Sequence, residues 1–104
     1  MIESIEIKPF YNLLEHVLSV PELYSIESVK SLGQFINGFR VATAAYKIED
    51  SDLKNFELFT KFVKQRYDIV GGYDWVRIIN FYSSSSANSL KVFEKLLVEF
   101  KLSN

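Results

Sequence analysis

The chain has 104 residues, the length of one domain, so we expect a single domain over residues 1–104. Hydrophobic residues make up 48% of it and aromatic residues 15%, which is enough for one core, and the 24% of charged residues is typical of a folded chain. The absence of cysteine excludes disulfides, thiolate zinc sites and iron–sulfur clusters. A formal net charge of −1 argues against direct binding to nucleic acid.

The N-terminal segment carries no signal for secretion. Its first charged residues are acidic, and no apolar run of signal-peptide length follows them. No stretch approaches the ~18 consecutive apolar residues of a membrane span. We therefore expect a cytoplasmic protein without a membrane partner.

A first helix is predicted by apolar residues at helical spacing, namely Phe10, Leu13, Leu14, Val17 and Leu18. Pro9 suits the first turn of this helix because its missing N–H needs no partner there. Pro21 ends the segment because it disfavours helical angles at Val20. Upstream, Ile2–Ile7 fits either an extended arm or an extra helical turn.

A second helix is predicted by a longer stripe, consisting of Val29, Leu32, Phe35, Ile36, Phe39, Ala42 and Tyr46. Gly33 and Gly38 lie inside this stripe, and each costs about 1 kcal/mol relative to alanine in a helix interior. Two explanations remain open for such glycines: another backbone packs closely against them, or the helix bends near Gly38.

The third stripe consists of Leu53, Phe56, Phe59, Phe62 and Val63, and Gly71-Gly72 then breaks the pattern. Residues 75–82 have apolar side chains at helical spacing, although Val76–Ile79 is rich enough in β-branched residues for a strand. We predict a helix here, with Asp74 as its N-cap.

The last stripe consists of Leu90, Phe93, Leu96, Leu97 and Phe100, and the serines at 83–86 form the loop before it. Together these patterns predict an all-α fold, a compact single-domain bundle of about five helices. The alternative is an α+β fold, in which Trp75–Tyr82 or Ile2–Ile7 forms a strand.

No residue pattern points to catalysis or to a metal. His16 is the only histidine, and Ser19, at helical spacing from it, has no oxyanion site nearby in sequence. Glu49, Asp50 and Asp52 form one acidic cluster, but it lacks the central glycine of a calcium-binding loop, so we expect a solvated turn whose acids favour the next helix N-terminus. We assign no catalytic residue, metal or cofactor, and we expect no enzyme.

Four aromatic residues lie at segment ends beside acidic groups: Tyr24, Tyr46, Tyr73 and Trp75. Each fits either a cap on the helical core or an anchor for a partner protein. Residues 49–74 carry four basic and six acidic groups, whereas residues 75–104 carry four basic and two acidic groups. The acidic middle segment favours a basic partner.

Several segments in order resemble a bacterial protein family. They are Pro21–Tyr24, Ser31-Leu32 and Phe35–Phe39 in the first half, then Trp75–Tyr82 and Leu90–Phe100 after a serine-rich turn. Over about residues 20–100, this order is similar to that of immunity proteins from polymorphic toxin and contact-dependent growth inhibition systems.

The resemblance implies a cytoplasmic inhibitor that binds a cognate toxin domain, often a nuclease, and blocks its active site or another functional surface. Charge and residue type place the toxin-binding residues at Glu22, Tyr24, Glu27, Glu49, Asp50, Asp52, Tyr73, Asp74 and Trp75. The expected partner is a basic nuclease domain. The alternative is a helical homo-oligomeric scaffold or adaptor, and a weak homodimer is also left open.

Overall fold

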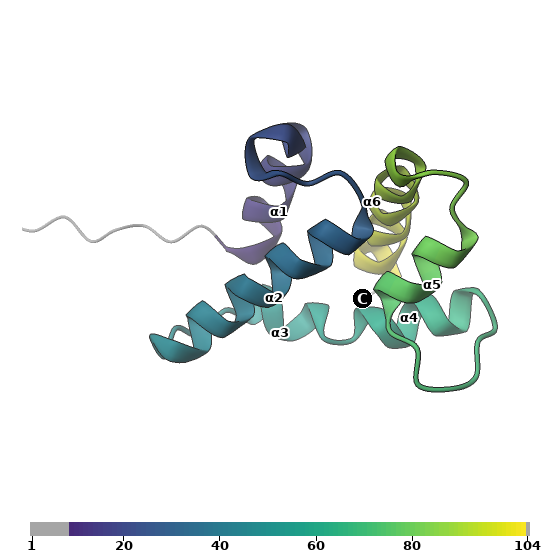
Figure 1. The fold of residues 1–104 in the computed structure, drawn as a ribbon. Helices are drawn as coiled ribbons and strands as arrows, with labels where there is room; N and C mark the ends of the chain where they lie inside the picture. The colour runs from purple at the N-terminus through teal and green to yellow at the C-terminus, as the bar shows by residue number, and fades with distance from the viewer. Residues whose placement is uncertain (1–8, 104) are drawn as a thin grey trace, which may run out of the picture.

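The computed structural model describes residues 9–103, and this range contains only helices and loops (Figure 1). The predicted all-α class is therefore confirmed, and residues 75–82 form a helix. Asp74 caps this helix as expected, because its carboxylate accepts a hydrogen bond from the Arg77 amide at 3.0 Å. The segment Ile2–Ile7 lies outside the described residues.

In chain order the elements are α1 (Phe10–Ser19), the 3₁₀ turn η1 (Pro21–Tyr24), α2 (Val29–Ala45), α3 (Ser51–Phe56), α4 (Phe59–Arg66), α5 (Trp75–Tyr82) and α6 (Ser86–Ser103). The stripe predicted as the third helix is divided into α3 and α4. The division arises because the amides of Glu57 and Leu58 donate to the carbonyls of Lys54 and Asn55, only three residues back. The regular helical pattern resumes when the Phe62 amide donates to the Leu58 carbonyl.

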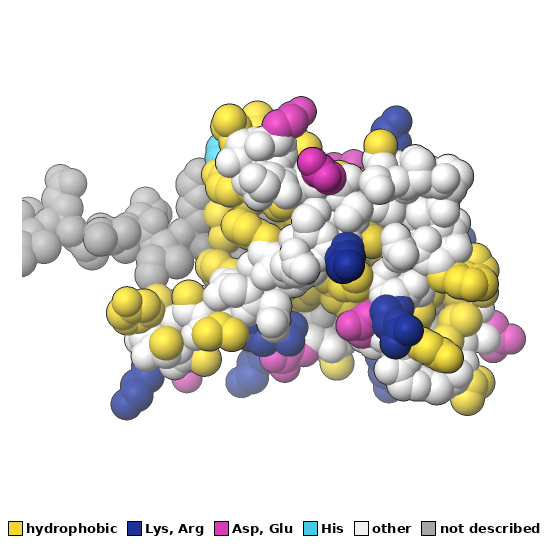
Figure 2. Space-filling view, viewed as in Figure 1, with side chains coloured by type: hydrophobic (Ala, Val, Ile, Leu, Met, Phe, Trp, Pro, Cys, Tyr) yellow, Lys and Arg dark blue, Asp and Glu magenta, His cyan; other side chains and the backbone are white. Residues whose placement is uncertain are grey.

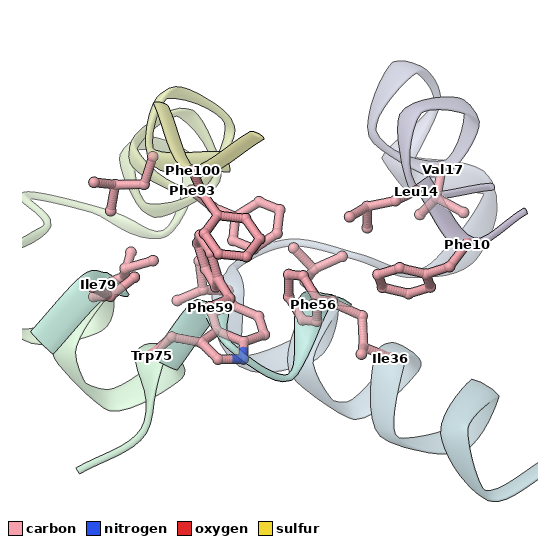
Figure 3. Packing of buried hydrophobic residues seen from close by; sticks show 14 of the residues in the cluster. Phe10, Leu14, Val17, Ile36, Phe56, Phe59, Trp75, Ile79, Phe93 and Phe100 are labelled. Carbon is pink, nitrogen blue, oxygen red and sulfur yellow. The ribbon is translucent and has the colours of Figure 1, made fainter. Parts of the chain in front are cut away.

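Aromatic rings from α3, α4, α5 and α6 form the centre of the core (Figure 3). The Phe59 ring lies 5.0 Å from Phe56, 5.4 Å from both Phe93 and Phe100, and 5.7 Å from Trp75, measured between ring centroids. All five rings are buried. Burial of one such ring contributes about 2–3 kcal/mol, so this cluster determines how the four helices pack.

Helix α1 joins the core through Phe56. The Phe10 ring lies 5.1 Å from Phe56 and 5.6 Å from Phe39, and Leu14 and Val17 are buried beside it on the same helix. Figure 3 shows Phe56 between the side chains of α1 and the rings of α4 and α5. Phe56 therefore connects α1 to the rest of the aromatic core.

A buried serine connects the N-terminal ends of α2 and α6. The Ser89 hydroxyl accepts a hydrogen bond from the Val29 amide at 3.1 Å and donates one to the Ser86 carbonyl at 2.6 Å. Ser28 and Ser31 complete a capping box at the start of α2. Because the Ser89 hydroxyl is fully paired, it is accommodated in the core without an unsatisfied polar group.

The two glycines of α2 have different environments. A Cβ atom at Gly33 would lie 2.7 Å from Cγ2 of Val76, so a side chain of α5 packs closely against α2 at this point, and not the backbone that we expected as one of two explanations. A Cβ atom at Gly38 would meet no atom within 4 Å, and α2 continues as one helix to Ala45. Close packing therefore explains Gly33 but not Gly38.

The C-terminal end of α2 lies at an edge of the molecule (Figure 1). Tyr46, which the sequence pattern placed on the apolar stripe, is 79% exposed there. The prediction that Tyr46 belongs to the buried stripe was wrong, because no other helix covers the C-terminal end of α2 within the described residues. None of the helices in residues 9–103 is long and apolar enough to cross a membrane.

Replacing each helical glycine with alanine should change stability in opposite directions. We expect Gly38→Ala to raise the free energy of unfolding by about 1 kcal/mol through helix propensity alone. We expect Gly33→Ala to lower it by about 1 kcal/mol, because overpacking against the stiff Val76 side chain outweighs the same gain. Urea unfolding measures both values, and a stabilising Gly33→Ala would contradict the close α2–α5 contact. In a Val76→Ala background, the cost of Gly33→Ala should disappear.

Candidate functional site

The nine candidate binding residues lie in three places in the fold. Glu22, Tyr24 and Glu27 belong to η1 and the loop after it. The acidic turn, which we define as residues 49–52, leads into α3. The third group, residues 73–75, leads into α5 on the other side of the molecule from η1 (Figure 1).

The acidic turn stabilises two helix N-termini. Oδ1 of Asp50 accepts a hydrogen bond from the Leu53 amide at 3.0 Å and so caps α3, as expected for an acid before a helix. Oδ2 of the same carboxylate accepts from the Phe10 amide at 3.0 Å, at the start of α1. Pro9 provides no capping side chain for α1, so Asp50 supplies the missing acceptor from 40 residues away.

Tyr11 is the second link between α1 and the acidic turn. Its amide donates to Oδ2 of Asp52 at 3.4 Å, and its hydroxyl donates to Oδ1 of Asn55 at 2.5 Å. The Lys101 ammonium lies 4.8 Å from the centre of its ring. Burial raises the pKa of Tyr11 to about 12, and the nearby carboxylates of Asp52 and Asp50 contribute to the rise.

The acids of this turn therefore differ in what they offer a partner. The carboxylates of Asp50 and Asp52 are half-buried and occupied by backbone amides of α1 and α3. Glu49 is exposed, and no described residue hydrogen-bonds its carboxylate. Of the three predicted contacts, Glu49 alone combines exposure with a carboxylate that has no partner in residues 9–103.

The η1 segment presents one aromatic and two acidic side chains. Glu22 and Glu27 are exposed, with no described ion-pair partner. The Tyr24 ring packs edge-on against His16 at 5.9 Å and Phe35 at 5.7 Å, so it covers the junction of α1 and α2. Tyr24 thus caps the core with one side of its ring and leaves the other side exposed.

The segment before α5 divides between core and surface. Trp75 is 7% exposed, and its ring lies 4.9 Å from Phe93. It is therefore a core residue whose side chain offers almost no surface to a partner. The Asp74 carboxylate is exposed but caps α5, whereas Tyr73 is 50% exposed and its ring lies beside the Arg77 guanidinium.

Tyr73 borders a hollow that we call the aromatic pocket. It has a volume of about 380 Å³ and lies between the loop after α4 and the outer face of α5. Its lining residues are Asp68, Ile69, Val70, Tyr73, Arg77, Ile78, Phe81 and Tyr82. The Arg77 guanidinium lies 5.5 Å from the centre of the Tyr73 ring, and the Tyr82 ring stacks on Tyr67 at 4.6 Å.

Of the residues that line this pocket, Tyr73 alone was predicted as a candidate, and two of the others are the most exposed apolar residues there. Phe81 is 79% exposed and Val70 is 92% exposed. Phe81 does not fall at the helical spacing of the apolar stripe of α5, and this mismatch in the sequence could have identified it as exposed. Val70 precedes the Gly71-Gly72 break, and no periodic pattern identifies its side chain as exposed.

A second hollow, which we call the α2–α5 groove, has a volume of about 520 Å³. Three cationic side chains line it: Lys30 and Arg40 from α2, and Arg77 from α5. Asp74 is the acidic residue in its lining, beside the amides Gln34, Asn37 and Asn80. Figure 2 shows basic side chains over α2 and α5 on this face.

The groups considered for catalysis do not form a site. The Ser19 hydroxyl donates to the backbone carbonyl of His16 at 2.6 Å, not to its ring. The His16 ring is exposed beside Tyr24. Within residues 9–103, no three His, Asp or Glu side chains come together in a cluster that could hold a metal ion.

The comparisons with known proteins identify no relative. No protein-family model, no curated protein and no solved structure matches this chain.

Removing the Asp50 carboxylate should destabilise the fold more than removing that of its neighbour Glu49. We expect Asp50→Ala to lower the free energy of unfolding by about 2 kcal/mol, because two helix N-termini lose an acceptor. Glu49→Ala should change it by less than about 0.5 kcal/mol. Urea unfolding of the two variants provides the comparison, and equal values would contradict the double cap.

Tyr11 should make the fold sensitive to alkaline pH. Its folded-state pKa of about 12 exceeds the ordinary value of 10.0, so the fold favours the neutral phenol. The resulting stabilisation is fully present below pH 10 and is lost as pH rises through about 12. In an absorbance titration, one of the six tyrosines should ionise last, and Tyr11→Phe should remove that step. If Tyr11→Phe leaves the last step in place, the assignment fails.

Proposed function

We propose that this chain is an immunity protein that acts in the cytoplasm, where it binds a cognate toxin domain and blocks its active site or another functional surface. The observation that carries the proposal is the aromatic pocket, an exposed apolar hollow with a cation at its edge. The resemblance over about residues 20–100 supplies the class of partner.

The composition of the pocket favours a protein partner. Phe81 and Val70 remain mostly exposed, and covering a phenylalanine side chain contributes about 2 kcal/mol. Tyrosine and arginine are the residue types that most often dominate binding energy, and Tyr73 and Arg77 lie side by side here. Exposed apolar clusters of this kind are typical of interaction sites.

The pocket is also held in shape before any partner binds. The Arg77 guanidinium packs on the Tyr73 ring, and Tyr82 stacks on Tyr67. The backbone under Arg77 is fixed because Ile78 and Ile79 are buried in the core. A preformed surface loses little side-chain entropy on binding, which supports the affinity, on the order of nM or tighter, that an inhibitor needs.

The proposed partner is a nuclease toxin, as the resemblance implies. Three exposed glutamates, Glu22, Glu27 and Glu49, are available to basic groups of such a domain. Asp50 and Asp52, which the sequence also placed among the binding residues, are less available because their carboxylates accept hydrogen bonds from backbone amides of α1. Charge at the rim of an interface mainly affects the association rate, whereas the aromatic pocket would supply the affinity.

Co-expression tests the proposal. The proposal predicts a neighbouring gene for a large secreted protein. The C-terminal domain of that protein should be toxic to cells, and the chain should rescue them. We expect Tyr73→Ala/Phe81→Ala to weaken binding to that domain at least 100-fold and to abolish rescue, because two large contacts are lost. Calorimetry on the purified proteins gives the affinity.

The matched control is Val41→Ala/Tyr46→Ala, which removes an aliphatic and an aromatic side chain from the exposed end of α2. This variant should retain full affinity and rescue. Absence of rescue by the unmutated chain would discard the immunity proposal. Concentration-dependent dimerisation that Tyr73→Ala/Phe81→Ala abolishes, with no toxin binding, would favour the homo-oligomeric scaffold instead.

A further inference from the structure

The α2–α5 groove concentrates positive charge in a chain whose formal net charge is −1. Lys30 and Arg40 lie ten residues apart on α2, and Arg77 comes from α5. The close contact of Gly33 with Val76 brings the two helices together at this point. The groove has a volume of about 520 Å³, a size that accommodates several side chains of a bound segment.

No described carboxylate forms an ion pair with the three cations of the groove; Arg40 also lines a neighbouring hollow that contains Glu49, Asp50 and Glu57. The ion pair between described side chains joins Arg66 to Glu99 at 3.5 Å, and no described carboxylate pairs with Lys30, Arg40 or Arg77. Asp74 lies in the same groove, but its carboxylate accepts the Arg77 amide as the cap of α5. The groove therefore presents an excess of positive charge that attracts anionic groups.

The groove adjoins the aromatic pocket through one shared residue. Arg77 lines both hollows, with its guanidinium beside the Tyr73 ring. Asn80, one turn further along α5, lines the groove, whereas Phe81 lines the pocket. The outer face of α5 thus presents polar groups to the groove on one side and apolar groups to the aromatic pocket on the other.

We propose that the α2–α5 groove binds an acidic segment of the partner protein, with its carboxylates against Lys30, Arg40 and Arg77 and an adjoining apolar side chain in the aromatic pocket. Gln34, Asn37 and Asn80 can donate to and accept from the backbone of such a segment. This inference rests on the proposed function for the identity of the partner. It adds that the partner's surface facing α2 and α5 is acidic.

The observations favour an acidic protein segment over a nucleic acid. Nucleic-acid sites generally combine a basic face with a high positive net charge, whereas this chain is slightly acidic overall. The adjoining pocket holds aliphatic side chains, Ile69 and Val70, which suit an apolar side chain.

A titration with defined probes tests the groove directly. The first probe is a capped peptide of four glutamates, a Gly-Ser pair and one phenylalanine. The second probe is the same peptide with glutamine in place of each glutamate. The third probe is a short single-stranded DNA. With the isotope-labelled chain, amide shifts from the glutamate peptide should map to the groove and the aromatic pocket. The glutamine peptide should bind at least fivefold more weakly, and the DNA should cause no localised shifts.

Charge reversal at the groove provides the matched comparison. Lys30→Glu/Arg40→Glu should weaken binding of the glutamate peptide at least tenfold, because attraction is replaced by repulsion. Lys61→Glu/Lys95→Glu makes the same change in net charge on exposed side chains of α4 and α6 and should leave binding unchanged. Equal loss in both variants would mean that only net charge matters, and it would overturn the proposal.

The outcomes separate this inference from the proposed function. If the peptide shifts map elsewhere, or if the DNA binds more tightly, the groove proposal is wrong even when the chain rescues cells. If Lys30→Glu/Arg40→Glu binds the toxin domain with unchanged affinity, the groove proposal is also wrong and the immunity proposal stands. If peptide binding follows the groove but the chain rescues no cells, the immunity proposal alone fails.

Discussion

The packing of α5 against the aromatic core is the constraint on which the rest of the structure depends. Trp75, Ile78 and Ile79 face inward, where the Trp75 ring meets those of Phe59 and Phe93. With three side chains of an eight-residue helix buried, rotation of α5 about its axis would expose apolar area that contributes several kcal/mol. Arg77 and Phe81 therefore have to face solvent, and the groove and the pocket form on either side of them.

A second long-range interaction explains why the acidic turn is a weaker binding candidate than its composition indicates. The Asp50 carboxylate accepts hydrogen bonds from amides at the N-termini of both α1 and α3. The Asp52 carboxylate accepts a further hydrogen bond from the Tyr11 amide of α1. Acidic residues near helix N-termini often serve the fold in this way, because the first amides of each helix lack partners. Among these acids, only Glu49 has a carboxylate without a hydrogen-bond partner in the part of the chain that the structure describes. Reversing the whole turn to lysine would therefore disturb folding as well as binding.

Much of the fold follows from local sequence patterns. The stripes on α1, α2 and α6 are periodic, and Asp74 identifies the start of α5. The division between α3 and α4 was not predictable, because neither glycine nor proline marks it.

Less of the candidate site could be predicted from the sequence. Trp75 is the first residue of α5, so the direction of its side chain depends on packing against α4 and α6. Lys30, Arg40 and Arg77 line one groove only because α2 packs against α5, a tertiary contact that no local pattern encodes.

The central claim is that the outer face of α5 contacts the partner. Site-specific photo-crosslinking in cells tests it most directly, with a photoreactive phenylalanine at position 81 or, for comparison, at the exposed position 46. We predict a covalent adduct with the toxin domain from position 81 and none from position 46. An adduct from position 46 alone would contradict the account.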